Sequence, residues 1–167
     1  LSAIPGEHPY AVINGITVGK IVDMNMKDTF NMGCCMAPAA ADVIIANFED
    51  FGHGPDYYDK IITGDLGRVG QEALFHLLQQ RGYDISARHM DCGMEIFDIS
   101  QDGTESGGSG CGCAASVLAS YILPKLRNGE WKRVLFVPTG ALLNKTSFNE
   151  GKPILGIAHA VMLEGIG

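Results

Sequence analysis

The chain has 167 residues, of which 46% are apolar and 19% charged, and its formal net charge is −7. This composition is typical of one globular domain and excludes a disordered or fibrous chain. The acidic balance, without any block of Lys or Arg, argues against nucleic acid as a partner. No apolar run reaches the roughly 18 residues that a membrane-spanning helix needs.

The first third of the chain predicts a strand followed by a helix. β-forming residues from Tyr10 to Met26 predict a strand, with a turn at Asn14-Gly15. Pro38 is expected at the first position of the helix, where its missing N–H does no harm. Apolar residues at helical spacing then continue to Phe51, and Gly52 ends the helix.

The middle third predicts a short buried strand from Asp59 to Thr63 and a tight connection, Gly64-Asp65-Leu66-Gly67, into a second helix. Gly82 suits the C-terminal cap of that helix. A weak strand and then a loop are expected through Met94 to Phe97.

The last third predicts a loop, a helix and two strands. The helix starts near Cys113 and ends at Gly129, and Pro124 is expected to kink or shorten its last turn. The remaining segments are a loop from Gln101 to Gly112, a strand from Arg133 to Val137, a polar hairpin-like loop from Asn144 to Lys152 and a strand from Gly156 to Leu163. Alternating strands and helices favour parallel pairing with helical crossovers, and the closing pair can be antiparallel.

The cysteines and the other polar residues carry no familiar catalytic pattern. The number of cysteines is odd and two pairs are too close for ordinary disulfides, which favours reduced thiols: Cys34, Cys35, Cys92, Cys111 and Cys113. We expect Cys34 and Cys35 to be a buried pair and His159 to be a satisfied core histidine. The acids Asp91, Asp98 and Asp102 are expected to be solvated or turn-forming.

One glycine-rich segment, Gly107 to Cys113, leads into a predicted helix. Free N–H groups at such a helix start attract anions, and glycines let a ligand approach closely. The alternative is a flexible turn whose cysteines pack as small apolar groups. A zinc set of His89, Cys92, Cys111 and Cys113 is disfavoured by its spacing, so no metal and no cofactor are expected.

The stretch Gly110-Cys111-Gly112-Cys113-Ala114-Ala115-Ser116 resembles the second half of ketoacyl-synthase-type condensing enzymes. The closer resemblance, over the whole chain, is to the stage V sporulation protein AD family of thiolase-fold proteins. It is carried by His89 to Glu95, Ser106 to Cys113 and Pro138 to Leu143. The resemblance implies an α/β, thiolase-like layered fold, with residues 1–167 forming the C-terminal half of a duplicated architecture. That half would hold one five-stranded mixed sheet with helices.

The resemblance also implies that this chain is no enzyme. In condensing enzymes this half supplies a catalytic His and Asn, whose positions fall here at Gly64 and Cys111. A glycine transfers no proton, and a thiol does not replace the two N–H donors of an amide. No catalytic residue is therefore expected. The smaller groups at Gly64 and Cys111 are expected to enlarge the pocket.

The family resemblance implies a ligand: dipicolinic acid (pyridine-2,6-dicarboxylic acid), or its calcium chelate, taken up into the developing spore. The candidate ligand-binding residues are Gly64, Asp65, Gly110, Cys111, Gly112, Cys113, Thr139 and Gly140. Expected partners are other spore membrane transport proteins and either a missing N-terminal half or a second copy. The expected location is cytoplasmic and peripheral to the spore inner membrane. An acyl-transferring or condensing enzyme, and a structural subunit of a spore membrane transport complex, remain alternatives.

Overall fold

The computed structural model describes residues 9–98, 100, 103, 106–107 and 110–166. At its centre lies a five-stranded mixed sheet with the strand order β1-β7-β4-β2-β3. The strands β2 (Lys60–Thr63), β3 (His89–Asp91) and β4 (Arg133–Val137) are parallel. The strand β7 (Ala160–Gly165) runs antiparallel to β4 and to the edge strand β1 (Ala11–Thr17). This architecture confirms the predicted α/β class and the mixed sheet.

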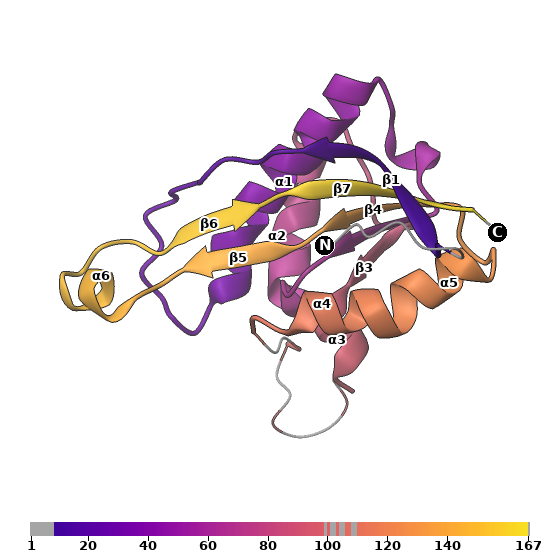
Figure 1. Cartoon of the computed structure of the whole chain (residues 1–167). Coiled ribbons are helices and arrows are strands. Elements are labelled where there is room, and N and C mark those ends of the chain that lie inside the picture. Colours follow the sequence, from indigo (N-terminus) through magenta and orange to yellow (C-terminus); the bar gives the residue numbers. More distant parts are fainter. Residues whose placement is uncertain (1–8, 99, 101–102, 104–105, 108–109, 167) are drawn as a thin grey trace.

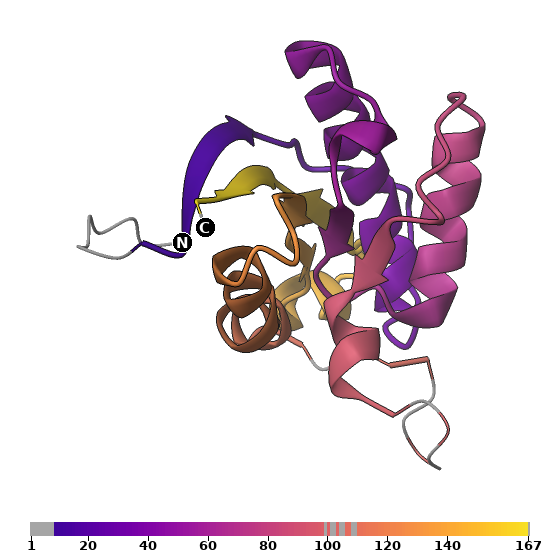
Figure 2. The same ribbon diagram turned by 90° about the vertical axis from the view of Figure 1, so that its right-hand side faces the viewer.

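Helices cover both faces of the sheet and make three layers (Figures 1 and 2). On one face lie α1 (Met32–Phe51) and α2 (Gly67–Gln79). On the other lies a continuous helix made of α4 (Cys113–Val117), the π-helical turn η2 (Leu118–Ile122) and α5 (Leu123–Arg127). The short helices α3 (Cys92–Ile96) and η1 (Pro55–Tyr57) complete the body.

The core divides into two clusters because side chains alternate across a strand. On β2, Ile61 belongs to the cluster beneath α1 and α2, and its neighbour Ile62 belongs to the cluster beneath α4 and α5. On β4, Leu135 and Phe136 divide in the same way. These strands are buried on both faces, which is why they read as unbroken apolar runs.

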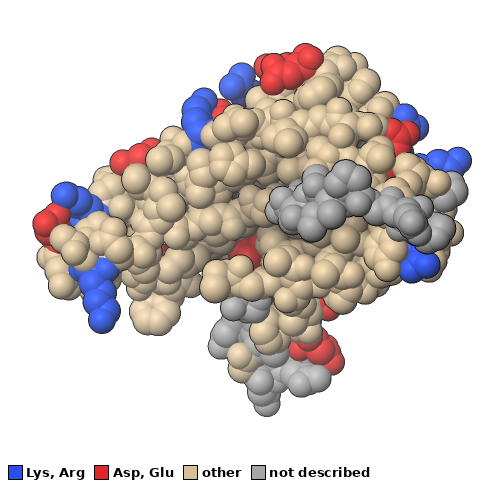
Figure 3. Space-filling model, viewed as in Figure 1, with Lys and Arg blue, Asp and Glu red and all other residues tan. Residues whose placement is uncertain are grey.

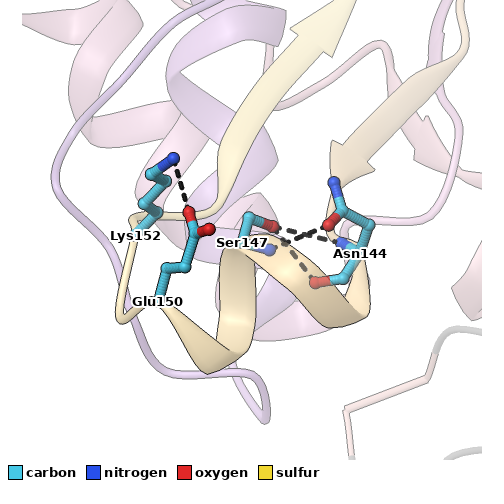
Figure 4. Close-up of polar contacts among 4 residues, drawn as sticks. All are labelled: Asn144, Ser147, Glu150 and Lys152. Atoms are coloured by element: carbon cyan, nitrogen blue, oxygen red, sulfur yellow. Dashed lines mark hydrogen bonds and ion pairs between the residues drawn. The ribbon is translucent and has the colours of Figure 1, made fainter.

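An arm extends from the body next to the sheet (Figure 1). Its strands, β5 (Thr139–Leu142) and β6 (Leu155–Ala158), form a separate antiparallel pair, and α6 (Lys145–Asn149) lies at the tip. Asn144 and Ser147 form a capping box at the start of α6, and Lys152 pairs with Glu150 at 2.6 Å (Figure 4). The hairpin expected between Val137 and Gly156 is therefore real, but its strand β5 and its helix were not predicted.

The first predicted strand is wrong in its second half. Only Ala11–Thr17 is a strand, and the residues from Val18 to Asn31 are irregular apart from one bridge between Val22 and Gly156. The expected turn at Asn14-Gly15 is instead a bulge, because the register with β7 shifts between Ile13 and Gly15.

The start of the first helix was also predicted wrongly. The helix α1 begins at Met32, where the Asn31 side chain accepts the backbone N–H of Cys34 at 3.4 Å. Pro38 therefore lies inside the helix and withholds one backbone hydrogen bond, the one that the carbonyl of Cys34 would accept. The predicted end is confirmed, since Gly52 adopts the left-handed conformation of a C-terminal cap.

Three further segments differ from the predictions. The loop expected before Phe97 contains α3, because Asp91 caps this helix. The helix is not shortened at Pro124 but continues to Arg127, and its regular hydrogen bonding is interrupted just before the proline by the π-helical turn η2. The last strand is split into β6 and β7 at His159, which is exposed and accepts the N–H of Gly19 rather than lying in the core.

The predicted loop from Gln101 to Gly112 falls partly outside the described residues, including Asp102. Asp98 forms the expected turn, with Ser100 donating to its Oδ1. Among the described residues, no helix is both long enough and apolar enough to cross a bilayer.

Candidate functional site

A cleft of about 1000 Å³ opens where the parallel strands β2 and β4 end. Its described walls come from residues 28–36, 65–69, 106–107, 110–114 and 139–141. Ligands of open α/β sheets bind outside the carboxyl ends of parallel strands, where loops from several strands converge. The position of this cleft makes it the candidate ligand site.

The structure brings most of the predicted site residues together in this cleft. Five of them line it: Asp65, Gly110, Cys111, Thr139 and Gly140. Three lie next to it without lining it: Gly64, Gly112 and Cys113.

Asp65 connects the walls of the cleft to one another. The backbone N–H of Gly110 donates to Asp65 Oδ2 at 2.5 Å. The backbone N–H of Asp65 donates to Thr139 Oγ1 at 3.3 Å. Because these bonds link the loop after β2 with the glycine-rich segment and with β5, Asp65 holds the shape of the site.

Gly64 does not enlarge the cleft, contrary to our expectation. A Cβ on this residue would lie 2.7 Å from the backbone N of Thr139 and 2.9 Å from its Oγ1. Real Cβ contacts are longer than this, so β5 would have to move. The volume that an imidazole would need at Gly64 is filled by Thr139.

The two cysteines of the glycine-rich segment have different surroundings. Cys111, which the resemblance aligns with the condensing-enzyme Asn, is exposed and lines the cleft. Cys113 is buried, and its Sγ points to the carbonyl oxygen of Gly64 at 3.6 Å. Cys92 is also buried, and this burial, with the nearby charge of Asp91, raises the pKa of its thiol. Of these three thiols, only that of Cys111 is presented to a ligand in the cleft.

Asp91 is a buried carboxylate, and the prediction that it is solvated or merely turn-forming is wrong. It is only 2% exposed. Its Oδ1 accepts the hydroxyl of Thr63 and the N–H of Leu66, at 2.7 and 2.9 Å. Its Oδ2 accepts the N–H groups that begin α2 and α3, at 3.0 to 3.3 Å: those of Gly67, Gly93 and Met94. A carboxylate at two helix N-termini is electrostatically favoured.

His89 lies behind the loop after β2 and does not line the cleft. Its Nε2 lies 2.9 Å from Thr63 Oγ1, and its Nδ1 lies 2.8 Å from Gln71 Nε2. Since the Thr63 hydroxyl donates to Asp91, Thr63 accepts from Nε2–H, and Nδ1 accepts from the Gln71 amide. Burial, together with the charge of Lys60, lowers the pKa of His89 to about 4. His89 is therefore a neutral histidine with a fixed tautomer.

The described lining of the cleft is acidic. Asp28 and Asp65 are its charged members, and no Lys or Arg stands among the described lining residues. The uncharged lining is apolar or small apart from the amide of Asn31, and it includes one aromatic residue, Phe30, which is 99% exposed. The wall of the cleft that contains Asp28 and Phe30, residues 28–36, was not predicted as part of the site. Recognising Asn31 as a helix cap would have placed the residues before it in a loop at the edge of the sheet.

The chain is similar to known proteins in sequence and in fold. The sequence model of the family described as stage V sporulation protein AD (SpoVAD) matches residues 3–164. The stage V sporulation protein AD of Bacillus subtilis (strain 168) is 42% identical over 167 residues. That match covers 100% of this chain and 48% of the Bacillus protein, so the chain spans about half the length of this curated relative.

Among solved structures, the chain is similar to AbyA1, a tetronic acid condensing enzyme, with a TM-score of 0.53. The match covers 96% of this chain and 49% of that chain, at 14% identity. Identity at this level shows the fold alone, and that fold is thiolase-like.

Proposed function

This chain belongs to the stage V sporulation protein AD family, which implies a role in sporulation, and from that premise we propose that it is a non-catalytic binding protein for dipicolinate. The observation that carries the proposal is the cleft of about 1000 Å³ at the carboxyl ends of β2 and β4. Its volume is in the range of small-molecule sites, and a few polar groups among apolar walls are typical of them.

The charge of the lining favours the calcium chelate as the bound form. Free dipicolinate is a dianion, and Asp28 and Asp65 would repel it. The 1:1 chelate is neutral, and carboxylate oxygens are ligands that Ca²⁺ prefers. The start of α4, next to Cys111 and Ala114 in the lining, offers N–H groups to a ligand carboxylate.

The absence of catalysis is supported by the positions that the fold would use for it. Gly64 has no side chain and no room for one. His89 is engaged by Thr63 and Gln71 behind the loop, so it does not replace the missing imidazole in the cleft. The described lining holds no His or Lys that could serve as the base for the exposed thiol of Cys111.

The chain also offers a surface for the rest of a larger assembly. Charged side chains are sparse over most of the face shown in Figure 3 and lie mainly at its edges and at the arm. β1 crosses this face as an edge strand, with Ile13, Ile16 and nearby Val18 exposed. An unpaired apolar edge calls for a partner.

We propose that the chain is the C-terminal half of its protein and packs against the other half or a second copy. We further propose that it acts beside transport proteins at the spore inner membrane.

Titration calorimetry on the intact protein tests the proposed ligand. We expect binding of dipicolinate in excess calcium, and weaker binding when EDTA removes the metal. Asp65→Asn should weaken binding about tenfold, because the loop that Asp65 holds through Gly110 is loosened. Asp42→Asn, at an exposed pair with Lys20 away from the cleft, is the matched control. Absence of binding in both conditions would refute the proposal, and turnover of acyl-CoA would favour the condensing-enzyme alternative.

A further inference from the structure

The rim of the cleft carries one aromatic side chain that packs against almost nothing. Phe30 is 99% exposed, and it is the only aromatic residue among the described residues that line the cleft. Another exposed aromatic side chain keeps part of its surface covered: Phe148, on the arm, is 56% exposed. Single exposed apolar side chains are common on protein surfaces, so what distinguishes Phe30 is that it lines the cleft.

The backbone around Phe30 is held in place on both sides. The N–H of Phe30 donates to Asp28 Oδ1 at 2.9 Å, and the N–H of Asn31 donates to the carbonyl of Asp28 at 3.3 Å. Asn31 in turn caps α1 through Cys34. Phe30 therefore stands on a short turn that is fixed to the start of a long helix, at the edge of the cleft that it lines.

The other large apolar residues of the lining are not aromatic. Met32, Met36, Leu66 and Val69 form the wall beside Phe30. Aliphatic side chains accept any apolar group, whereas an aromatic ring gains an additional offset-stacking or edge-to-face contact from a flat aromatic ligand. Asp28, two residues before Phe30, also lines the cleft, so a ring-binding group and an acidic group occur on the same turn.

We infer that Phe30 is the ring-recognising residue of the cleft, and that it selects planar aromatic dicarboxylates over aliphatic ones of similar charge. This inference rests on the proposed function. In the bound state the pyridine ring packs on Phe30, and the calcium-bearing edge faces the acidic groups Asp28 and Asp65. Phe30 is then exposed because its packing partner is the ligand.

Binding measurements on the intact protein test this role. Phe30→Leu keeps an apolar side chain but removes the ring, and we expect its affinity for calcium dipicolinate to fall about 2- to 12-fold, the value of one aromatic pair. Phe30→Tyr should retain the affinity. Phe148→Leu, which removes an exposed ring from the arm, is the matched control and should bind like wild type.

A spectroscopic measurement tests the contact directly. The emission of a Phe30→Trp variant should be quenched when calcium dipicolinate binds, relative to wild type, whose only tryptophan in this chain is Trp131. A Phe148→Trp variant should show no added quenching.

The outcomes separate the inference from the proposed function. The inference is wrong, and the proposed function stands, if Phe30→Leu binds as well as wild type and the emission of Phe30→Trp is not quenched. If wild type itself does not bind, the proposed function fails. A loss of thermal stability in Phe30→Leu at unchanged affinity would assign Phe30 to a protein contact and also overturn the inference.

Discussion

Thr63, the last residue of β2, donates its hydroxyl to Asp91, the last residue of β3, at 2.7 Å, and both side chains are buried. The same carboxylate accepts the N–H of Leu66, which lines the cleft. The end of one strand therefore fixes the loop that follows its neighbour, and the shape of the candidate site depends on a residue that does not touch the ligand.

We predict that Asp91→Asn is strongly destabilising. The amide would place its NH₂ group against N–H donors that now point at a carboxylate, those of Gly67 and Gly93 among them. Buried charged hydrogen bonds are worth about 1.5–3 kcal/mol each, and we expect a loss of at least about 3 kcal/mol. Denaturant unfolding measures it, with Asp23→Asn, at an exposed turn, as the control. Equal midpoints for the two variants would show that Asp91 does not hold these loops.

Asp91 also shows where sequence reasoning ends. The strands Lys60–Thr63 and Arg133–Val137 could be predicted because each is an apolar run between breakers. The sequence around Asp91 resembles any polar loop start, and three of the five donors to its carboxylate, those of Thr63, Leu66 and Gly67, lie more than twenty residues earlier in the chain. Its burial is a property of the tertiary structure.

The same contrast applies to the candidate site. The glycine-rich segment was predicted from its composition, and Asp65, Thr139 and Gly140 from family motifs. The wall that holds Phe30 was missed because Pro38 suggested a later helix start than the Asn31 cap provides. A local rule about proline was outweighed by packing of the first turn of α1 against the rest of the chain.

The stability of the fold should depend on pH through His89. Its pKa in the folded protein is about 4, below the ordinary value of 6.5. The unfolded chain therefore binds more protons between these values, and stability falls as the pH drops from about 6.5 to 4. From pH 7.5 to 5 we expect a loss of about 2 kcal/mol from this residue.

Unfolding free energies at the two pH values, for wild type and His89→Gln, test this dependence. The variant should lose most of that difference, because no imidazole remains to take up a proton. His76→Gln, which removes an exposed histidine from α2, controls for loss of a histidine as such. An unchanged pH dependence in His89→Gln would mean that other groups cause it.

Placing an imidazole at Gly64, the position predicted to match the condensing-enzyme histidine, should damage the fold rather than create activity. In Gly64→His, the Cβ would lie 2.7 Å from the backbone N of Thr139 and would displace β5. Overpacking of this kind costs about 1–3 kcal/mol. Gly112→Ala is the matched control, since a Cβ there has no neighbour within 4 Å and its φ is −91°. Thermal unfolding compares the variants. A Gly64→His protein as stable as wild type would show that β5 can be displaced at little cost in stability.

The thiols should differ sharply in their reaction with a maleimide. Cys111 is exposed in the cleft, whereas Cys92 and Cys113 are buried, and burial raises the pKa of the Cys92 thiol. The thiolate is the reactive form, so burial and a raised pKa both slow modification. We expect peptide mapping by mass spectrometry to show Cys111 labelled first, Cys34 more slowly because it is half-buried, and Cys92 and Cys113 only after unfolding.

Calcium dipicolinate should protect Cys111 and leave the labelling of Cys34, which does not line the cleft, unchanged. Labelling of Cys111 at the same rate with and without bound ligand would place the ligand elsewhere, because a thiol in the wall of an occupied cleft is screened from the reagent.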